Sequence, residues 1–279
     1  MSKTLLITGA STGFGKHLAE EALKQGYQVI ATARQPETLQ YLKDTANDKI
    51  LMLRLDVTDR SSIKEAFNLG LRKFGKIDVL VNNAGFGMIG AVEEFSECEI
   101  QQQFDTNFFG ALWTIQEALP YMRSQKSGHI INISSVAGFV GYPGSALYAA
   151  SKHALEGLSQ GLEKEVSSLG IYVTMVNPGP FRTNFAGSSL KIASKKIEAY
   201  GDSVHIRQEN LKNNLHGNQA GDPLKAAKAI LNVVRMVKPP FTLPLGEMAF
   251  REIPNRLKQT LDEIEAVKSI GLPTDYTTD

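Results

Sequence analysis

Short apolar runs alternate with segments of helical spacing along most of this chain. The runs are apolar at consecutive positions, which is typical of strands that are covered on both faces of a sheet. The segments between them repeat apolar residues at the spacing of amphipathic helices. This alternation predicts right-handed βαβ units and an α/β fold with a doubly wound parallel sheet. The runs lie at residues 4–9, 27–33, 49–57, 77–83, 129–134, 171–177 and 241–245.

The chain has 279 residues, and no repeat or Pro/Gly/Ser-rich linker divides it. We therefore expect one domain over residues 1–279. Residues 184–221 interrupt the alternation because they are polar and poor in strand signals, so we expect a large insertion there. Residues 247–279 are expected to form a C-terminal helical extension.

The composition excludes several kinds of function. A formal net charge of +1 provides no electrostatic basis for binding nucleic acid or an anionic membrane. No apolar run reaches the ~18 residues of a membrane span, so we expect a cytoplasmic protein. Cys98 is the only cysteine, which rules out an intrachain disulfide. The histidines have no partners at metal-ligand spacing, so no metal is expected.

A glycine-rich turn, TGASTGFG (8–15), links the first apolar run to a helical segment. Glycine at positions 9, 13 and 15 allows the backbone to turn tightly and to approach a pyrophosphate, which the free N–H groups of a helix N-terminus then bind. The same glycines are compatible with an ordinary strand-to-helix turn. Their place after the first strand favours a nucleotide, although a methyltransferase also uses a glycine-rich first loop.

The end of the second run indicates which dinucleotide is bound. An acid at this position binds the ribose 2′-hydroxyl of NAD, whereas a basic residue accepts the 2′-phosphate of NADP. Ala33 is uncharged and Arg34 follows it, which favours NADP(H) unless Arg34 is only a surface residue. Asp56 ends the third run, where its carboxylate either accepts from the adenine amino group or caps the helix that begins near Asp59.

The stretch SALYAASKHALEG (145–157) places Tyr148 and Lys152 one helical turn apart on one face. Taken alone, the pair fits an amphipathic helix with a polar edge as well as it fits catalysis. The same helix carries small residues opposite Tyr148, with the charged Glu156, Glu163 and Lys164 on one flank. Another helix can approach small residues closely, so we interpret the stripe as a subunit interface rather than a contact with a loop of the same chain. The stripe consists of Ala150, Ala154, Gly157 and Gly161.

Seven motifs together resemble the short-chain dehydrogenase/reductase family in its compact single-domain form. They occur in the family's order over residues 3–183: TGASTGFG, DV (56–57), NNAG (82–85), Asn107 within TNFFG, NISS (132–135), YAASK (148–152) and NPGPFRT (177–183). The resemblance implies a Rossmann-type sheet of seven parallel strands in the order 3-2-1-4-5-6-7. It also implies an NADP(H)-dependent oxidoreductase that interconverts a carbonyl and its alcohol, assembled as a homodimer or homotetramer.

The resemblance also implies roles for single residues. Tyr148 would be the general acid/base, and the ammonium of Lys152 would stabilise its phenolate, since an unperturbed tyrosine titrates near 10. Ser135 would donate to the substrate oxygen, and Asn107 would hold a water molecule beside Lys152, unless it is only a polar residue that kinks its helix. The cofactor would contact Gly9, Ser11, Thr12, Gly13, Phe14, Gly15, Arg34, Asp56, Val57, Asn83, Ala84, Gly85, Tyr148, Lys152, Pro178, Gly179 and Thr183.

Apolar side chains in the loops near the nicotinamide suit a hydrophobic ketone or aldehyde, over which residues 184–221 would close as a lid. They are Phe86, Met88, Phe139, Tyr142, Phe181 and Phe185. One alternative is a polar or anionic carbonyl substrate that meets the lid cations Lys191, Lys195, Lys196 and Arg207. Another is a dinucleotide-sensing protein without turnover, although such proteins typically lose the Tyr-x-x-x-Lys pair.

Overall fold

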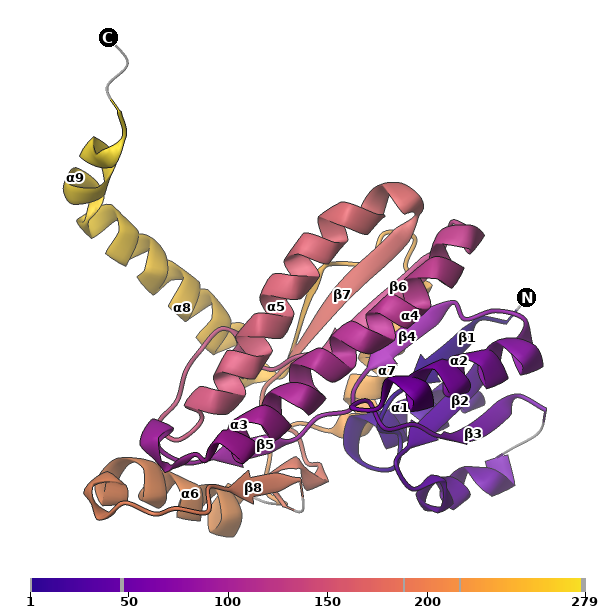
Figure 1. The fold of residues 1–279 in the computed structure, drawn as a ribbon, viewed down its shortest axis with the longest axis horizontal. Helices are drawn as coiled ribbons and strands as arrows, with labels where there is room; N and C mark the ends of the chain where they lie inside the picture. Colours follow the sequence, from indigo (N-terminus) through magenta and orange to yellow (C-terminus); the bar gives the residue numbers. More distant parts are fainter. Residues whose placement is uncertain (1, 46–47, 188, 216, 277–279) are drawn as a thin grey trace.

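A seven-stranded parallel sheet forms the centre of the molecule (Figure 1), in the order β3-β2-β1-β4-β6-β7-β9. The computed structural model describes residues 2–45, 48–187, 189–215 and 217–276. Each of the seven apolar runs overlaps one of these strands, with bounds that agree within a few residues. The strand order is the one that the resemblance implied, so the predicted fold class is confirmed. The strands are β1 (Thr4–Ile7), β2 (Gln28–Ala33), β3 (Ile50–Arg54), β4 (Val79–Asn82), β6 (Gly128–Ile133), β7 (Ile171–Pro178) and β9 (Thr242–Leu245).

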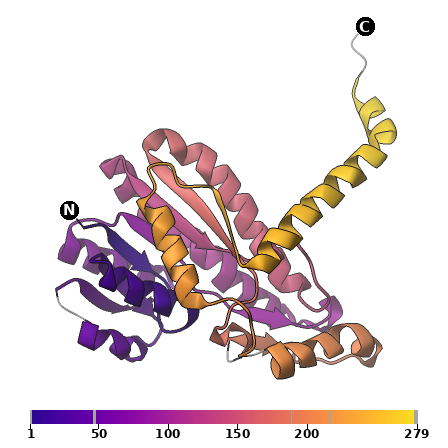
Figure 2. The ribbon, with the colours of Figure 1, turned by 180° about the vertical axis from the view of Figure 1, so that it is seen from behind.

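Helices cover both faces of the sheet (Figures 1 and 2). Leu5 and Ile7 of β1 pack into one core with α1 and α7, whereas Leu6 packs into the other core with α2, α4 and α5. Neighbouring residues of one strand are therefore buried on opposite faces, which explains the uninterrupted apolar runs. The first face carries α1 (Gly13–Lys24) and α7 (Pro223–Arg235), and the second carries α2 (Arg60–Phe74), α4 (Gly110–Gln125) and α5 (Ala146–Val166).

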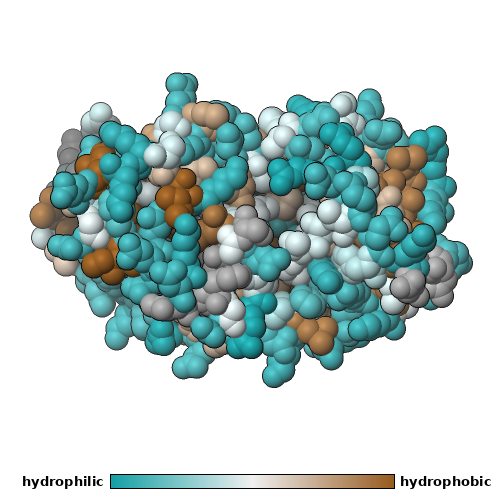
Figure 3. Space-filling model, turned by 90° about the horizontal axis from the view of Figure 1, so that it is seen from below, coloured by the Kyte–Doolittle hydropathy of each residue, from teal (hydrophilic) through white to brown (hydrophobic). Residues whose placement is uncertain are grey.

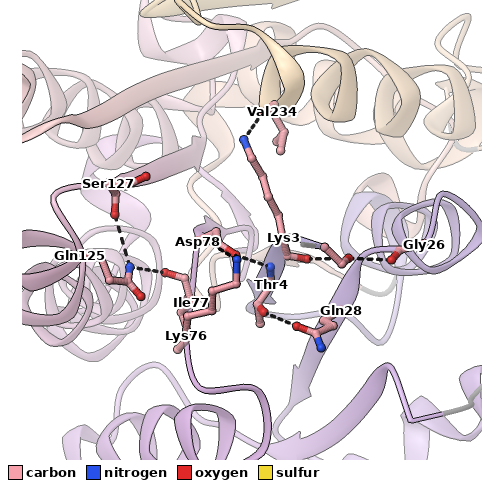
Figure 4. Close-up of polar contacts among 11 residues, drawn as sticks. Lys3, Thr4, Gly26, Gln28, Lys76, Ile77, Asp78, Gln125, Ser127 and Val234 are labelled. Carbon is pink, nitrogen blue, oxygen red and sulfur yellow. Dashed lines mark hydrogen bonds and ion pairs between the residues drawn. The ribbon is translucent and has the colours of Figure 1, made fainter.

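Polar contacts fix the amino ends of the strands, at the edge of the sheet where the βα loops do not lie (Figure 4). The backbone N–H of Thr4 donates to Asp78 Oδ2 at 2.7 Å, and its hydroxyl donates to Gln28 Oε1 at 2.8 Å. Lys3 Nζ donates to the carbonyl of Val234 at 2.7 Å, which connects β1 to α7. These contacts hold β1, β2 and β4 in register and leave the opposite edge for a site.

Residues 184–221, which we call the lid segment, are joined to the body by a small second sheet. In it β8 (Leu190–Ile192) pairs in parallel with β5 (Gly87–Ile89). The lid segment also contains the short helix α6 (Ile206–Asn210), and α3 (Glu97–Phe104) lies on the body side. Seen from below, the face that carries α6 and β8 is mostly hydrophilic, with separate apolar patches (Figure 3). Positions 188 and 216 of the lid segment lie outside the described residues.

A buried carboxylate attaches the lid segment to the body. Glu94 is 2% exposed and accepts from the N–H groups of Ala91 (2.7 Å) and Ile197 (2.8 Å) and from His205 Nε2 (2.8 Å). Nearby, Glu99 Oε1 accepts from the N–H of Ser194 at 2.8 Å. The polar lid sequence is therefore anchored by acidic residues that precede and begin α3.

The C-terminal helices α8 (Glu247–Ala266) and α9 (Lys268–Gly271) project away from the body (Figure 1). Only the start of α8 is anchored, because its buried residues are Ala249 and Ile253. Further along, Leu257, Leu261 and Ile264 are exposed. Within the ranges that the structure describes, no helix has the length and apolar character to cross a bilayer. Residues 277–279 of the predicted extension lie outside those ranges.

Candidate active site

One cavity of about 900 Å³ opens at the carboxyl ends of the strands. It extends from the glycine-rich turn after β1, past the ends of β4 and β6, to the lid segment. The strand order reverses between β1 and β4, and ligands of open parallel sheets bind at such a switch point. The topology therefore brings the sequence-predicted motifs to one place.

The glycine-rich turn has the shape of a phosphate cradle. Gly9 has φ +65°, and a Cβ on it would lie 2.9 Å from Ala84 Cα, so a side chain does not fit. At the next turn, Thr12 precedes α1 without capping it through its side chain, which leaves the first N–H groups of the helix available to an anion. The turn therefore fits the pyrophosphate of a dinucleotide.

The loop after β4 holds this turn in place through reciprocal hydrogen bonds. Asn83 Nδ2 donates to the carbonyls of Thr8 and Gly9, at 2.9 Å each. In return, Thr8 Oγ1 accepts from the N–H groups of Asn83 and Ala84, at 3.0 Å each. Asn83 and Ala84 also line the cavity, so the NNAG motif both shapes the site and faces it.

Arg34 and Asp56 line the far end of the cavity, after β2 and β3. Arg34 is exposed, directly after the buried Ala33. Asp56 Oδ1 accepts from the N–H of Thr58 at 3.0 Å and from its hydroxyl at 2.8 Å. The alternative that Asp56 caps the next helix is wrong, because Asp59 caps α2 by accepting from the N–H groups of its first turn.

Tyr148, Lys152 and Ser135 meet on the cavity wall. Tyr148 and Lys152 lie one turn apart near the start of α5 and are 9% and 6% exposed. Lys152 Nζ lies 5.8 Å from the centre of the Tyr148 ring and donates to the carbonyl of Ile133 at 2.8 Å. Ser135 follows β6, where its Oγ accepts from the N–H of Ala137 at 3.1 Å. The structure thus brings the three side chains to one wall.

Burial shifts the pKa of both members of the pair. It raises the pKa of Tyr148 to about 12, while hydrogen bonding with Ser135 acts in the opposite direction. It lowers the pKa of Lys152 to about 8, while the charge of Glu156 acts to raise it. Each shift favours the uncharged form, since a charge loses its hydration inside the protein. The phenol therefore holds its proton at neutral pH.

Asn107 lies behind this wall and does not line the cavity. It sits in a π-helical turn, Asp105–Phe109, between α3 and α4. Its Nδ2 donates to the carbonyl of Phe86 (2.9 Å) and to Ser151 Oγ (3.2 Å), and its Oδ1 accepts from the N–H of Phe86 (3.1 Å). Gly85 separates Asn107 from Lys152, since a Cβ on Gly85 would lie 3.2 Å from Asn107 Oδ1 and 3.8 Å from Lys152 Nζ.

Glu156, which the sequence predicted on a charged helix flank, is buried behind the cavity wall and acts electrostatically on Lys152. That placement is wrong, because Glu156 is only 4% exposed and its Oε1 accepts from Asn177 Nδ2 at 2.5 Å. Burial raises the pKa of Glu156, while hydrogen bonds and Lys152 lower it. The spacing of Glu156 in the sequence could have indicated this position, because Tyr148, Lys152 and Glu156 follow one another at four-residue steps on one face of the helix.

The predicted cofactor residues nearly all line the cavity; Gly15 packs beneath the turn, where a Cβ would lie 2.5 Å from the carbonyl of Gly9. Among the residues that the structure describes, no cluster of three or more His, Cys, Asp or Glu side chains could hold a metal ion. The lining cofactor candidates are Gly9, Ser11, Thr12, Gly13, Phe14, Arg34, Asp56, Val57, Asn83, Ala84, Gly85, Tyr148, Lys152, Pro178, Gly179 and Thr183.

Four of the six predicted substrate residues line the cavity: Phe86, Tyr142, Phe181 and Phe185. The ring of Phe185 lies 5.4 Å from that of Tyr148. The structure does not bring Met88 and Phe139 to the same wall. Met88 is buried in β5, and Phe139 packs against Ala249 and Ile253 of α8.

Two of the four predicted lid cations face the cavity. Lys191 and Arg207 line it, whereas Lys195 and Lys196 do not. Lys195 Nζ instead reaches the carbonyl of Glu93 at 3.5 Å on the exposed side of the lid segment. The positively charged part of the lid wall therefore consists of Lys191 and Arg207.

Comparisons with known proteins agree with this architecture. Residues 3–192 match the model of the short chain dehydrogenase family. A 3-ketodihydrosphingosine reductase of Bacteroides thetaiotaomicron is 38% identical over 250 residues, which cover 88% of each chain. The crystal structure of a short-chain dehydrogenase from Streptomyces avermitilis superposes with a TM-score of 0.91 at 38% identity, covering 98% of each chain.

A serine dehydrogenase solved in complex with NADP+ is similar over most of its length. Its TM-score is 0.75 at 30% identity, covering 87% of this chain and 94% of the other. The family match, the sequence identities and the shared fold lead to one conclusion. This chain belongs to the short-chain dehydrogenase/reductase family of oxidoreductases, which use a nicotinamide dinucleotide.

Proposed function

We propose that this protein is an NADP(H)-dependent oxidoreductase that interconverts a hydrophobic ketone or aldehyde and its alcohol. The observation that carries the proposal is the wall on which Ser135, Tyr148 and Lys152 meet, within the same cavity as the glycine-rich turn. A dinucleotide held by that turn would lie across the ends of β1 and β4, in the cavity that this wall lines. A regulator without turnover would not need a buried tyrosine beside a buried lysine.

The chain's own residues then supply everything except the hydride, which is the contribution of the bound nicotinamide. Ser135 donates to the carbonyl oxygen and holds it near Tyr148. Tyr148 gives its proton to that oxygen, a role that suits a phenol whose pKa is about 12. The ammonium of Lys152 stabilises the phenolate that remains, and it would also hold the ribose of a bound nicotinamide. In the reverse direction the phenolate accepts the proton of the alcohol.

Arg34 supports NADP(H) as the cofactor. Its guanidinium is exposed at the cavity wall, where it can bind two oxygens of a 2′-phosphate. Ala33 offers no carboxylate that would repel this phosphate, and Asp56 is occupied by Thr58. The similarity to a dehydrogenase that was solved with NADP+ points in the same direction.

The aromatic wall supports a hydrophobic substrate. Phe86, Phe181 and Phe185 line the cavity, and the ring of Phe185 lies 5.4 Å from that of Tyr148. We propose that the adjoining lid segment acts as a substrate lid. The related 3-ketodihydrosphingosine reductase is named for the reduction of a ketone, which agrees with the proposed carbonyl chemistry.

We also propose that the protein assembles as a homodimer or homotetramer through α5. Ala150, Gly157 and Gly161 are exposed, and a Cβ on either glycine would meet nothing within 4 Å. No described loop of the same chain covers them. An exposed helix normally carries charged residues there, whereas small residues let a second helix approach closely.

The direct test is the oxidation of NADPH in the presence of a panel of carbonyl compounds, from alkyl ketones to sugars. We expect turnover with long-chain ketones or aldehydes and a lower KM for NADPH than for NADH. A wild-type enzyme that oxidises NADPH with none of these carbonyls would contradict the reaction, and a preference for NADH would contradict the cofactor.

A further inference from the structure

Arg207 stands out among the residues of the cavity wall because it is a half-buried cation. It lies at the start of α6 in the lid segment, and its guanidinium carbon is 4.5 Å from the centre of the Tyr142 ring. Burial lowers the pKa of Arg207 from its ordinary value, while the charge of Tyr142 acts to raise it. Arg207 has therefore lost part of its hydration to the lid and to the loop before α5.

No carboxylate compensates for this loss within the described residues. The ion pairs of this region do not include Arg207, and Glu252, which is close enough to act on Tyr142, pairs with Arg251 at 2.9 Å. The hydroxyl of Tyr142 is also buried and has no hydrogen-bond partner there. Buried charges and hydroxyls are normally paired, so this end of the cavity has unused donors.

A contact that only latches the lid does not account for this arrangement. Stacking on Tyr142 uses one face of the guanidinium and leaves its N–H groups free. An apolar side chain at position 207 would close the lid against the ring without the cost of removing a charge from water. The charge is therefore better explained by an anion that enters the cavity.

A second lid cation lines the same cavity. Lys191 of β8 lies 4.7 Å from the centre of the Phe86 ring and donates to Gln102 Oε1 at 3.2 Å. The acids that line the cavity do not belong to the lid segment. Asp105 lies in the π-helical turn after α3, where it accepts from Gln101 Nε2 at 2.5 Å, and Asp56 follows β3. The lid side of the wall is thus positively charged.

We propose that Arg207, assisted by Lys191, forms an anion subsite for the far end of the substrate. The substrate class is then an amphiphilic carbonyl compound, with an apolar body against the phenylalanines and a carboxylate or phosphate monoester at Arg207. A guanidinium binds either group through two parallel hydrogen bonds. The subsite rests on the proposed function for the carbonyl reaction, whereas the binding of an anion at Arg207 can be measured separately.

The test measures binding without turnover. Isothermal titration calorimetry compares decanoate, decyl phosphate and the neutral decanamide, each below its micelle concentration, in the presence and absence of saturating NADP+. We expect wild-type protein to bind at least one anion about tenfold or more tightly than the amide, as a charge-assisted hydrogen bond predicts. Arg207→Gln should abolish this preference, and Arg207→Lys should keep part of it.

A matched control uses the lid lysine that faces away from the cavity. Lys195→Gln removes the same kind of charge from the same segment and should leave the preference for the anion intact. Equal binding of anion and amide by wild type, or a preference that survives in Arg207→Gln, overturns the subsite. Equal weakening of all three ligands in Arg207→Gln also overturns it, because Arg207 then only shapes the lid. Absence of carbonyl turnover would count against the proposed reaction and leave these binding results unaffected.

Discussion

At the scale of single residues, the proton of Tyr148 is the group on which the proposed chemistry depends. Tyr148→Phe keeps the ring that packs beside Phe185 and removes only the hydroxyl. We expect unchanged NADPH affinity in a fluorescence titration and a turnover at least ~10²-fold lower, the typical contribution of general acid catalysis. Near-normal turnover of this variant would contradict the role of Tyr148 as the general acid.

Arg34 determines the second prediction at this scale. Arg34→Ala should weaken NADPH binding by about 1.5–3 kcal/mol, the range for a charge-assisted hydrogen bond, and hardly change NADH binding. The two Michaelis constants, measured side by side, give the answer. Arg54→Ala is the control, because Arg54 is an exposed arginine at the end of the neighbouring strand that does not line the cavity. An equal loss for both cofactors would show that Arg34 does not contact the 2′-phosphate.

Residues within recurring local motifs could be placed from the sequence, and residues whose role depends on tertiary contacts could not. The spacing of Tyr148 and Lys152 sets their geometry within one helix, so the pair was predictable. Glu156 follows at the same spacing, but a charged residue on a helix is normally solvated. Its burial depends on Asn177, which lies on strand β7. Met88 and Phe139 are apolar residues of segments that the sequence predicts as loops, and core residues share that property.

At the scale of elements, the seven long strands were predictable because burial on both faces makes each one a continuous apolar run. The short strands β5 and β8 have three residues each and form only where residues 87–89 and 190–192 meet. No local periodicity exists over so few residues, so tertiary pairing decides their structure. The attachment of the lid segment could not be predicted either, because it depends on tertiary hydrogen bonds of Glu94 with residues about a hundred positions later in the chain.

Glu94→Gln tests how firmly that segment is attached. The variant loses the charge that serves His205 and two N–H groups, and we expect a loss of about 1–3 kcal/mol in the free energy of unfolding, measured in urea at pH 7. Proteolysis within the lid segment should also become faster. Glu97→Gln is the nearby control, since Glu97 is exposed at the start of α3 and a surface charge of this kind contributes about 0–1 kcal/mol. Equal effects of the two variants would contradict the anchoring role.

The same variant predicts a pH dependence. Burial alone would raise the pKa of Glu94, but its hydrogen bonds and His205 lower the pKa below the ordinary value of 4.5. The folded protein therefore binds this proton less readily than the unfolded chain, and the stabilisation is present above that ordinary value. It is lost as the pH falls through the lower native pKa. The difference in unfolding free energy between wild type and Glu94→Gln should therefore shrink in acid.

At the scale of the whole molecule, the exposed stripe on α5 predicts the state of assembly. Gly157→Glu places a charge where a Cβ meets nothing within 4 Å, so the variant should fold normally and keep its helical circular dichroism. Light scattering should show wild type as at least a dimer at micromolar concentration and the variant as a monomer. Asn68→Glu adds the same charge to the exposed side of α2 and should leave the assembly unchanged. A wild-type protein that is monomeric at this concentration would contradict the proposed assembly through α5.

The β5–β8 pairing and the glutamates of the body have a consequence for how new specificities can arise in this scaffold. The lid segment is fitted to residues 87–105 by backbone pairing and by contacts of Glu94 and Glu99, whereas the glycine-rich turn and Arg34 lie at the other end of the cavity. A grafted lid that displaces the N–H groups of residues 194 and 197, or that lacks His205, would leave these glutamates without their partners. A change of substrate specificity by exchange of the lid segment therefore requires the exchange of residues 87–105 as well. The residues that would bind the cofactor can stay unchanged.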